Sequence, residues 1–152
     1  MYSNSSILIF TDLDGSILHR DTFKFDQIKD YIKKLINSGV HIIPNSSKTE
    51  SEIVEFNQDL GENLAYISEN GSVINNLNLL NSNFPNKIIL SREKEELVEI
   101  FKNNLPENLQ SKCKFISNLN KKDQINIFGL SETKLKNALN RKSTEPFLFE
   151  GS

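Results

Sequence analysis

Two carboxylates, Asp12 and Asp14, follow directly after an apolar run at residues 7–10 and precede a glycine and a serine. In an extended chain residues i and i+2 point to the same side, so the two acids converge on one point. The apolar run predicts a strand buried on both faces, and the carboxyl edge of such a strand is where open α/β sheets hold ligands. Because neighbouring carboxylates repel each other, the pair predicts a bound cation or a shared proton, with an ordinary strand and Asp-Gly turn as the alternative.

Alternating helices and strands would position these acids. Apolar residues at helical spacing from Phe25 to Ile36 predict a helix that ends at Gly39, and a second helix follows Thr49 and ends at Gly61. Further strands are predicted at residues 40–44, 64–67 and 73–74. This alternation predicts an α/β fold with a parallel, doubly wound sheet and right-handed crossovers.

Three polar clusters, at residues 12–16, 45–49 and 68–72, each follow a predicted strand. The carboxyl ends of parallel strands meet at one edge of a sheet, so we expect the three clusters to gather there. That edge is the predicted place of any chemistry that this chain performs.

The chain changes character at residues 75–86, an Asn-rich and Pro-containing segment that predicts a linker. We therefore divide the chain into a core over residues 1–82 and a partial α+β cap domain over residues 83–152. The cap is predicted to hold a strand at residues 87–90, a helix capped by Ser91, helices over residues 121–128 and from Ser131 onward, and a strand at residues 147–149.

Composition and charge narrow the class of protein. The net charge is −2 and the basic residues form no stripe, which disfavours nucleic acid as a partner. No apolar stretch is long enough to span a membrane, and the N-terminus lacks the pattern of a signal peptide. A single cysteine, Cys113, and two histidines disfavour a zinc site and predict a reduced thiol. We expect a cytoplasmic protein.

The segment Asp12-Leu13-Asp14-Gly15-Ser16 resembles the first motif of the haloacid dehalogenase (HAD) superfamily of phosphatases, Asp-x-Asp-Gly-Thr/Ser at the end of the first strand. The resemblance implies a HAD-like fold with an inserted cap. It also implies that Asp12 is the nucleophile, which forms an aspartyl-phosphate, and that Asp14 is the general acid and base. By the same resemblance, the Asp12 carboxylate and the Asp14 main-chain carbonyl would bind Mg²⁺.

A second group, Ser46, Ser47 and Lys48, follows the next predicted strand. Ser46 resembles the serine or threonine with which HAD phosphatases hydrogen-bond the phosphoryl group, Ser47 is adjacent, and Lys48 adds positive charge. We expect these three residues to bind phosphate. A plain loop followed by a helix cap at Thr49 is the alternative for the same stretch.

Two later segments resemble substrate-binding parts of capped family members. Glu69-Asn70-Gly71 matches a turn in members whose cap follows the third strand, although the same residues suit an ordinary hairpin turn. Residues 141–149 resemble a segment of the mannosyl-3-phosphoglycerate phosphatases, as do residues 46–49. The resemblance implies that a sugar phosphate is bound by Asn70, Gly71, Arg141, Ser143, Thr144 and Glu145, whereas a surface ion pair is the alternative for Arg141 and Glu145.

The implied reaction removes phosphate from mannosyl-3-phosphoglycerate and gives mannosylglycerate, a compatible solute. The glucosyl analogue is a close alternative substrate. Residues 141–149 argue against the sucrose-phosphatase and phosphomannomutase types. A different class of function is a non-catalytic remnant that binds a sugar phosphate.

The resemblance covers only the first part of the family pattern. HAD phosphatases continue into a Lys and a Gly-Asp-x-x-x-Asp motif that completes the Mg²⁺ site, whereas no Asp follows Asp123 here. We therefore expect an N-terminal part of the family fold that is weakly active or inactive alone. Its incomplete sheet would expose an edge and apolar helix faces, which predicts self-association or a second polypeptide that completes the core.

Overall fold

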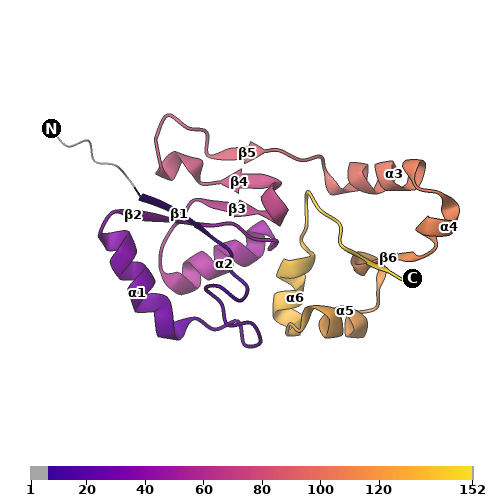
Figure 1. The fold of residues 1–152 in the computed structure, drawn as a ribbon, viewed down its shortest axis with the longest axis horizontal. Helices are drawn as coiled ribbons and strands as arrows, with labels where there is room; N and C mark the ends of the chain where they lie inside the picture. The colour runs from indigo at the N-terminus through magenta and orange to yellow at the C-terminus, as the bar shows by residue number, and fades with distance from the viewer. Residues whose placement is uncertain (1–6, 152) are drawn as a thin grey trace.

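The computed structural model describes residues 7–151, which form two lobes side by side (Figure 1). The core lobe holds β1 (Ile7–Thr11), α1 (Asp26–Asn37), β2 (Val40–Pro44), α2 (Glu50–Leu60), β3 (Tyr66–Ser68), η1 (Glu69–Gly71), β4 (Val73–Asn75), η2 (Leu77–Leu79) and β5 (Lys87–Ile89). The cap lobe holds α3 (Lys94–Asn104), α4 (Glu107–Gln110), β6 (Cys113–Phe115), η3 (Ile116–Asn118), α5 (Lys121–Phe128), α6 (Glu132–Leu139) and β7 (Phe147–Phe149). Among these helices, none combines the length and the apolar character that crossing a bilayer requires.

The strands of the core lobe run as one series from β1 to β5. β1 and β2 pair in parallel over their whole length. A parallel bridge between Asn45 and Ile67 joins the end of β2 to β3. β3, β4 and β5 then pair antiparallel. The predicted α/β class with parallel strands is confirmed, and the parallel part covers β1 to β3.

Both crossover helices pack on the same face of this sheet. The rings of Phe25, just before α1, and Phe56 of α2 have centroids 5.1 Å apart, and Lys29 of α1 donates to the Asp59 carbonyl of α2. β1, β2 and β3 are added in one direction, and right-handed crossovers then place successive helices on one side. The shared apolar cluster contains Leu13, Leu18, Ile32, Ile42, Ile53, Phe56, Leu60, Leu64 and Tyr66. Within residues 7–151 no crossover helix covers the opposite face of the parallel strands.

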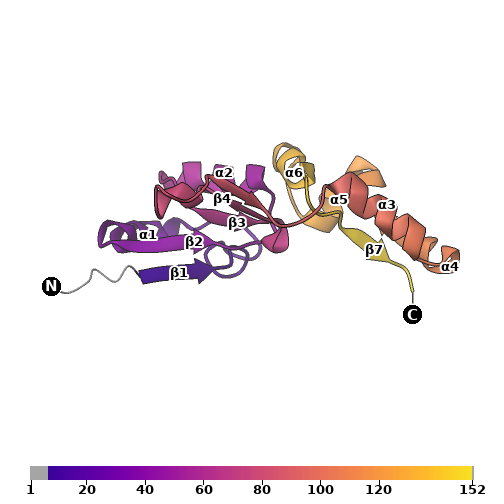
Figure 2. The ribbon, with the colours of Figure 1, turned by 90° about the horizontal axis from the view of Figure 1, so that it is seen from above.

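The prediction that residues 7–10 are buried on both faces is wrong. Ile7 and Phe10 are 59% and 58% exposed, and Leu8 and Ile9 are also exposed. The physical reason is the position of β1: among the described residues it pairs only with β2, at the end of the strand order, as Figure 2 shows from above. An apolar edge strand of this kind is the exposed edge that the sequence predicts.

The cap lobe is built on a short antiparallel pair, β6 and β7, which runs from Cys113 opposite Phe149 to Phe115 opposite Phe147. The rings of Phe101, Phe115 and Phe147 pack together with centroids 5.2 to 6.3 Å apart. The predicted helix over residues 121–128, the helix after Ser131 and the strand at residues 147–149 are confirmed.

Two predictions for the start of the cap are corrected. The strand assigned there, β5, pairs with β4 and extends the core sheet, so residues 76–86 form a hairpin connection and Asn75 ends β4. Ser91 does not cap a helix: α3 begins at Lys94 after Glu93, and the Ser91 hydroxyl donates to the Ser143 carbonyl instead. The division at residue 82 remains a prediction about the domains.

Candidate active site

The loops that follow β1, β2 and β3 lie together at one edge of the core sheet. The backbone amide of Asn45 donates to the Thr11 carbonyl at 2.8 Å, and the backbone amide of Ser46 donates to the Ile67 carbonyl at 3.1 Å. The backbone amide of Asn70 donates in turn to the Ser46 carbonyl, also at 3.1 Å. The predicted gathering of the three polar clusters is therefore confirmed.

The first loop presents Asp12 and Asp14 in different environments. The Asp12 side chain is exposed, and its Oδ1 accepts from the Leu13 amide at 2.8 Å. The next residue, Leu13, is fully buried and anchors the loop in the core. Asp14 Oδ1 is buried and lies 3.0 Å from Lys48 Nζ as an ion pair, without a hydrogen bond of good geometry among the described residues.

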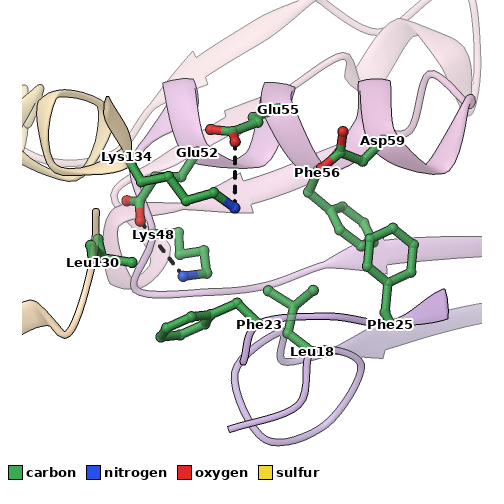
Figure 3. A pocket seen from close by; sticks show the side chains of 10 residues that line it. All are labelled: Leu18, Phe23, Phe25, Lys48, Glu52, Glu55, Phe56, Asp59, Leu130 and Lys134. Atoms are coloured by element: carbon green, nitrogen blue, oxygen red, sulfur yellow. Dashed lines mark ion pairs between the residues drawn. The ribbon is translucent and has the colours of Figure 1, made fainter. Parts of the chain in front are cut away.

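Lys48 lies between two carboxylates. Its Nζ is 3.0 Å from Asp14 Oδ1 and 3.6 Å from Glu52 Oε1, and it sits 5.2 Å from the ring centroid of Phe23. Figure 3 shows Lys48 next to Glu52 and Phe23 at the core side of this region. The charge of Lys48 therefore balances the acids of the site in the structure, and its contact with phosphate remains a prediction.

The two serines before Lys48 play different structural parts. Ser46 is buried, and its hydroxyl accepts from the Lys48 amide at 3.3 Å, which leaves its proton free for an acceptor. The side chain of Ser47 is exposed, and its carbonyl accepts from Arg141 Nη1 at 3.2 Å. Thr49 caps α2 as predicted, in a capping box with Glu52.

A cleft of about 250 Å³ opens between the lobes beside these residues. Its core wall includes Asp14, Ser47 and Lys48, and its cap wall includes Phe128 and Arg141. The sequence predicted each of these residues except Phe128 as part of the site. Groups separated by more than 90 residues in the chain thus face one space.

A second cavity, of about 380 Å³, adjoins the cap side. It is lined by Asn70, Arg141, Thr144 and Glu145 together with apolar residues that include Phe101. Arg141 therefore borders both spaces. The remaining predicted residues, Asp12, Ser46, Gly71 and Ser143, line neither space. Asp12 is exposed, Gly71 turns the hairpin with φ of +90°, and Ser46 and Ser143 are buried.

A smaller apolar hollow continues from Lys48 along α2, between the core and the cap (Figure 3). Phe25 and Phe56 close it at one end and Leu130 of the cap lies near the other. Lys134 of α6 reaches across to Glu55 of α2 at 3.6 Å. This ion pair is one of the polar contacts that hold the cap against the core.

The sequence reasoning missed Glu69, which connects the two lobes. Its carboxylate is buried and accepts from the amides of Lys142 and Ser143, each at 2.9 Å, and from the Thr144 hydroxyl at 2.7 Å. The neighbouring Glu145 is also well buried, 3.6 Å from Lys94. The family resemblance included Glu69 only as the first residue of the Glu69-Asn70-Gly71 turn and gave it no role of its own, and the same turn suits any hairpin.

Asp12 and Asp14 offer the oxygen donors that Mg²⁺ prefers. The buried Asp14 Oδ1 requires a cation, which Lys48 provides in the structure. Within residues 7–151 no group of three or more His, Cys, Asp or Glu side chains is placed to hold a metal. The two acids therefore fit part of a Mg²⁺ site whose other ligands would be water and phosphate oxygens, as Mg²⁺ commonly has.

Comparison with known proteins agrees with this arrangement. The family model of the haloacid dehalogenase-like hydrolases matches residues 9–144. A glucosyl-3-phosphoglycerate/mannosyl-3-phosphoglycerate phosphatase from Persephonella marina is 29% identical over 68 residues, which is 45% of this chain. The chain spans a quarter of the length of that curated relative, because the match covers 25% of it.

Solved structures show the same fold at low sequence identity. A haloacid dehalogenase-like hydrolase from B. subtilis matches 87% of this chain and 49% of its own, with a TM-score of 0.58 and 16% identity. The crystal structure of TM0651 from Thermotoga maritima matches 91% of this chain and 54% of its own, with a TM-score of 0.55 and 11% identity. With its family model, its HAD-like α/β fold and its paired aspartates, the chain belongs to the haloacid dehalogenase-like hydrolase family.

Proposed function

We propose that this chain carries the nucleophile half of a Mg²⁺-dependent phosphatase that hydrolyses the phosphate monoester of mannosyl-3-phosphoglycerate. The observation that carries the proposal is the cleft in which Asp14 and Lys48 of the core face Arg141 of the cap. Two acids, Asp14 and Glu52, and two cations, Lys48 and Arg141, line this space, and the Arg141 guanidinium suits an anionic group of the substrate. The similarity to the Persephonella marina enzyme supports the same substrate class.

In the proposed reaction the exposed Asp12 carboxylate attacks phosphorus, and the bond between phosphorus and the 3-oxygen of the glycerate breaks. Asp14 gives its proton to that leaving oxygen, then takes a proton from the water that attacks the aspartyl-phosphate. Lys48 and the Ser46 hydroxyl would stabilise the negative charge on the phosphoryl oxygens. Mg²⁺, when bound at Asp12 and Asp14, would offset the repulsion between carboxylate and phosphate.

A second substrate of the same class differs only in its sugar. The glucosyl-3-phosphoglycerate analogue is the alternative, and the relative's name covers both sugars. Asn70, Arg141, Thr144 and Glu145 line the 380 Å³ cavity and are the proposed contacts for the sugar and the glycerate. Gly71 and Ser143 would not contact the substrate and would instead fix the backbone next to Asn70 and Thr144.

Phosphate release by the purified chain tests the proposal. The two sugar 3-phosphoglycerates and sucrose 6-phosphate are compared with Mg²⁺ and with EDTA, against Asp12→Asn. We expect weak release that requires both Mg²⁺ and Asp12 and that is lost with sucrose 6-phosphate. Release unaffected by Asp12→Asn would contradict the assigned nucleophile. Glu150→Gln is a matched control, because Glu150 is an exposed cap residue paired with Lys114.

A non-catalytic protein that binds sugar phosphates is the second candidate. It is favoured by the small number of acids around Asp12 and Asp14, because no metal-holding group of three occurs within residues 7–151. Beryllium fluoride distinguishes the two candidates, since BeF₃⁻ bonds to an aspartate nucleophile only beside an assembled metal site. Trapping on Asp12, read by ¹⁹F NMR, supports the phosphatase, and ligand binding without trapping supports the binding protein.

We also propose a partner for the exposed strand β1. Its four apolar residues 7–10 are all exposed and one edge of the strand is unpaired in the described sheet. A second polypeptide, or a second copy of the chain, would complete the core by covering this strand.

A cytoplasmic location is proposed from the lone cysteine, Cys113, which is free in the structure.

A further inference from the structure

Glu69 occupies a position that is costly for its residue type. Only 2% of its surface is exposed, and a carboxylate is seldom buried unless it is paired. Its φ of +49° lies in the left-handed region, which residues with a side chain seldom adopt. Strain of this kind persists where the surrounding structure fixes it, and it is concentrated at functional sites.

The carboxylate is held by three donors from one segment of the cap. Oε1 accepts from the Lys142 amide at 2.9 Å, and Oε2 accepts from the Ser143 amide at 2.9 Å and from the Thr144 hydroxyl at 2.7 Å. The segment is tied to the core side a second time, because the hydroxyls of Ser72 and Ser91 donate to the Ser143 carbonyl. Glu69 thus fixes the backbone that immediately follows Arg141.

The Thr144 hydroxyl transmits this order to a side chain. An ionised carboxylate only accepts hydrogen bonds, so the single hydroxyl proton of Thr144 points to Glu69. Its lone pairs are then available on the other side, where Arg141 Nη1 donates at 2.8 Å. The result is a directional chain from Arg141 through Thr144 to Glu69.

Arg141 retains unused donors at the place where a ligand would lie. Its Nε is buried and has no hydrogen-bond partner within the described residues, while Nη1 also donates to the Ser47 carbonyl. A buried donor without a partner is rare in native structures. Arg141 borders both the 250 Å³ cleft and the 380 Å³ cavity, and a planar guanidinium suits a carboxylate or phosphate.

We propose that Glu69 is a positioning residue that, through the Thr144 hydroxyl, holds the Arg141 guanidinium to receive a second oxyanion of the substrate. The inference rests on the proposed function, since it takes the substrate to carry an oxyanion besides the reacting phosphate. Glu69 itself contacts no substrate. It sets the selectivity for doubly anionic substrates indirectly, through the orientation of Arg141.

Arginine side-chain NMR tests the positioning without any need for turnover, and the chain of 17.4 kDa is small enough for it. Thr144→Val removes the hydroxyl, keeps the side-chain shape and leaves the two bonds from the backbone to Glu69. We expect a lower heteronuclear NOE at Arg141 Nε–H, with unchanged hydrogen exchange at the Lys142 and Ser143 amides. Thr144→Ser keeps the hydroxyl and should restore the wild-type NOE.

Glu69→Gln is the second variant. A glutamine offers one acceptor oxygen in place of two, so we expect both the lower NOE at Arg141 and exchange at the Lys142 and Ser143 amides that is roughly tenfold faster. An Arg141 signal that is unchanged in both Thr144→Val and Glu69→Gln would overturn the proposal. Glu150→Gln, an exposed glutamate of the cap paired with Lys114, should change neither measurement.

Ligand titration connects the positioning to selectivity. The probes are 3-phosphoglycerate, which carries a phosphate and a carboxylate, and inorganic phosphate. We expect Thr144→Val and Glu69→Gln to weaken 3-phosphoglycerate roughly tenfold, as loss of a charged hydrogen bond does, with inorganic phosphate weakened less than twofold. A merely structural role would weaken both equally, and that result would overturn the proposal. If the wild-type chain fails to bind 3-phosphoglycerate, the proposed substrate is wrong, and the Arg141 signal still decides the positioning.

Discussion

Replacement of Thr49 by valine should lower the free energy of unfolding by about 2 kcal/mol. Thr49 is fully buried; its hydroxyl accepts from the Glu52 amide at 3.2 Å and donates to the Asn137 carbonyl of the cap at 2.8 Å. Valine keeps the shape, so only these bonds are lost. Loss of the helix cap, which leaves the Glu52 amide without its partner, costs about 1 to 2 kcal/mol. The Asn137 carbonyl keeps a bond from the Asn140 amide, so its share is the smallest, about 0.5 kcal/mol.

Urea unfolding followed by circular dichroism measures this loss, with Thr49→Ser as the control. Serine keeps the hydroxyl and gives up one buried methyl group, which costs about 0.8 kcal/mol. With a urea slope of about 1 to 3 kcal/mol per molar, the valine variant should unfold about 1 M earlier than wild type, and the serine variant should lie between them. A valine variant at least as stable as the serine variant would show that the hydroxyl does not join α2 to the cap.

Three further predictions concern pH, association and the site. Burial and, to a lesser degree, Glu50 raise the pKa of Tyr66 to about 12 from 10.0, so the contribution of Tyr66 to folding stability is full below pH 10 and falls as pH rises from 10 to 12. Tyr66→Phe should remove most of this fall, about 2 to 3 kcal/mol in urea titrations; an equally steep fall in the variant would contradict it. Ile7→Lys, on the exposed strand β1, should shift sedimentation toward the 17.4 kDa monomer, and unchanged association would place the contact elsewhere. Lys48→Met should lower kcat/KM for phosphate release about tenfold or more by leaving Asp14 without its cation, and an unchanged value would exclude the role given to Lys48.

Periodicity and turn chemistry predicted most of the core lobe. The helix after Thr49 and its end at Gly61 are confirmed, because the capping box and a left-handed glycine are local signals. The meeting of the three loops was predictable for a different reason: the order of parallel strands forces their carboxyl ends to one edge. The exposure of residues 7–10 was not predictable. The burial of a strand depends on whether another strand or helix packs against it in the fold, and not on the apolar run itself.

The parts that were missed depend on contacts between distant residues. Ser91 has the type and spacing of a helix cap, but its hydroxyl is taken by the Ser143 carbonyl, 52 residues away. Glu69 lies in a turn whose sequence suits any hairpin, and its role follows only from donors at residues 142–144. β6 is three residues long and gives no period to detect. Local patterns therefore predict where Asp12 and Asp14 lie, whereas the contacts that attach the cap follow only from the three-dimensional structure.

The two attachments of the cap differ in how they would respond to movement. Apart from the bond of the buried Thr49 hydroxyl to the Asn137 carbonyl, the bonds between α2 and the region of α6 are polar and partly exposed, such as Asn137 to Glu55 and Asn140 to Ser51, each at 2.9 Å. Water can replace such bonds at little cost when the helices separate. The contacts of Glu69 are buried, and breaking them would leave a buried carboxylate charge without its hydrogen-bond donors. If the cap moved relative to the core, Glu69 would therefore lie at the hinge, with Arg141 close to the hinge axis and Phe128 farther from it.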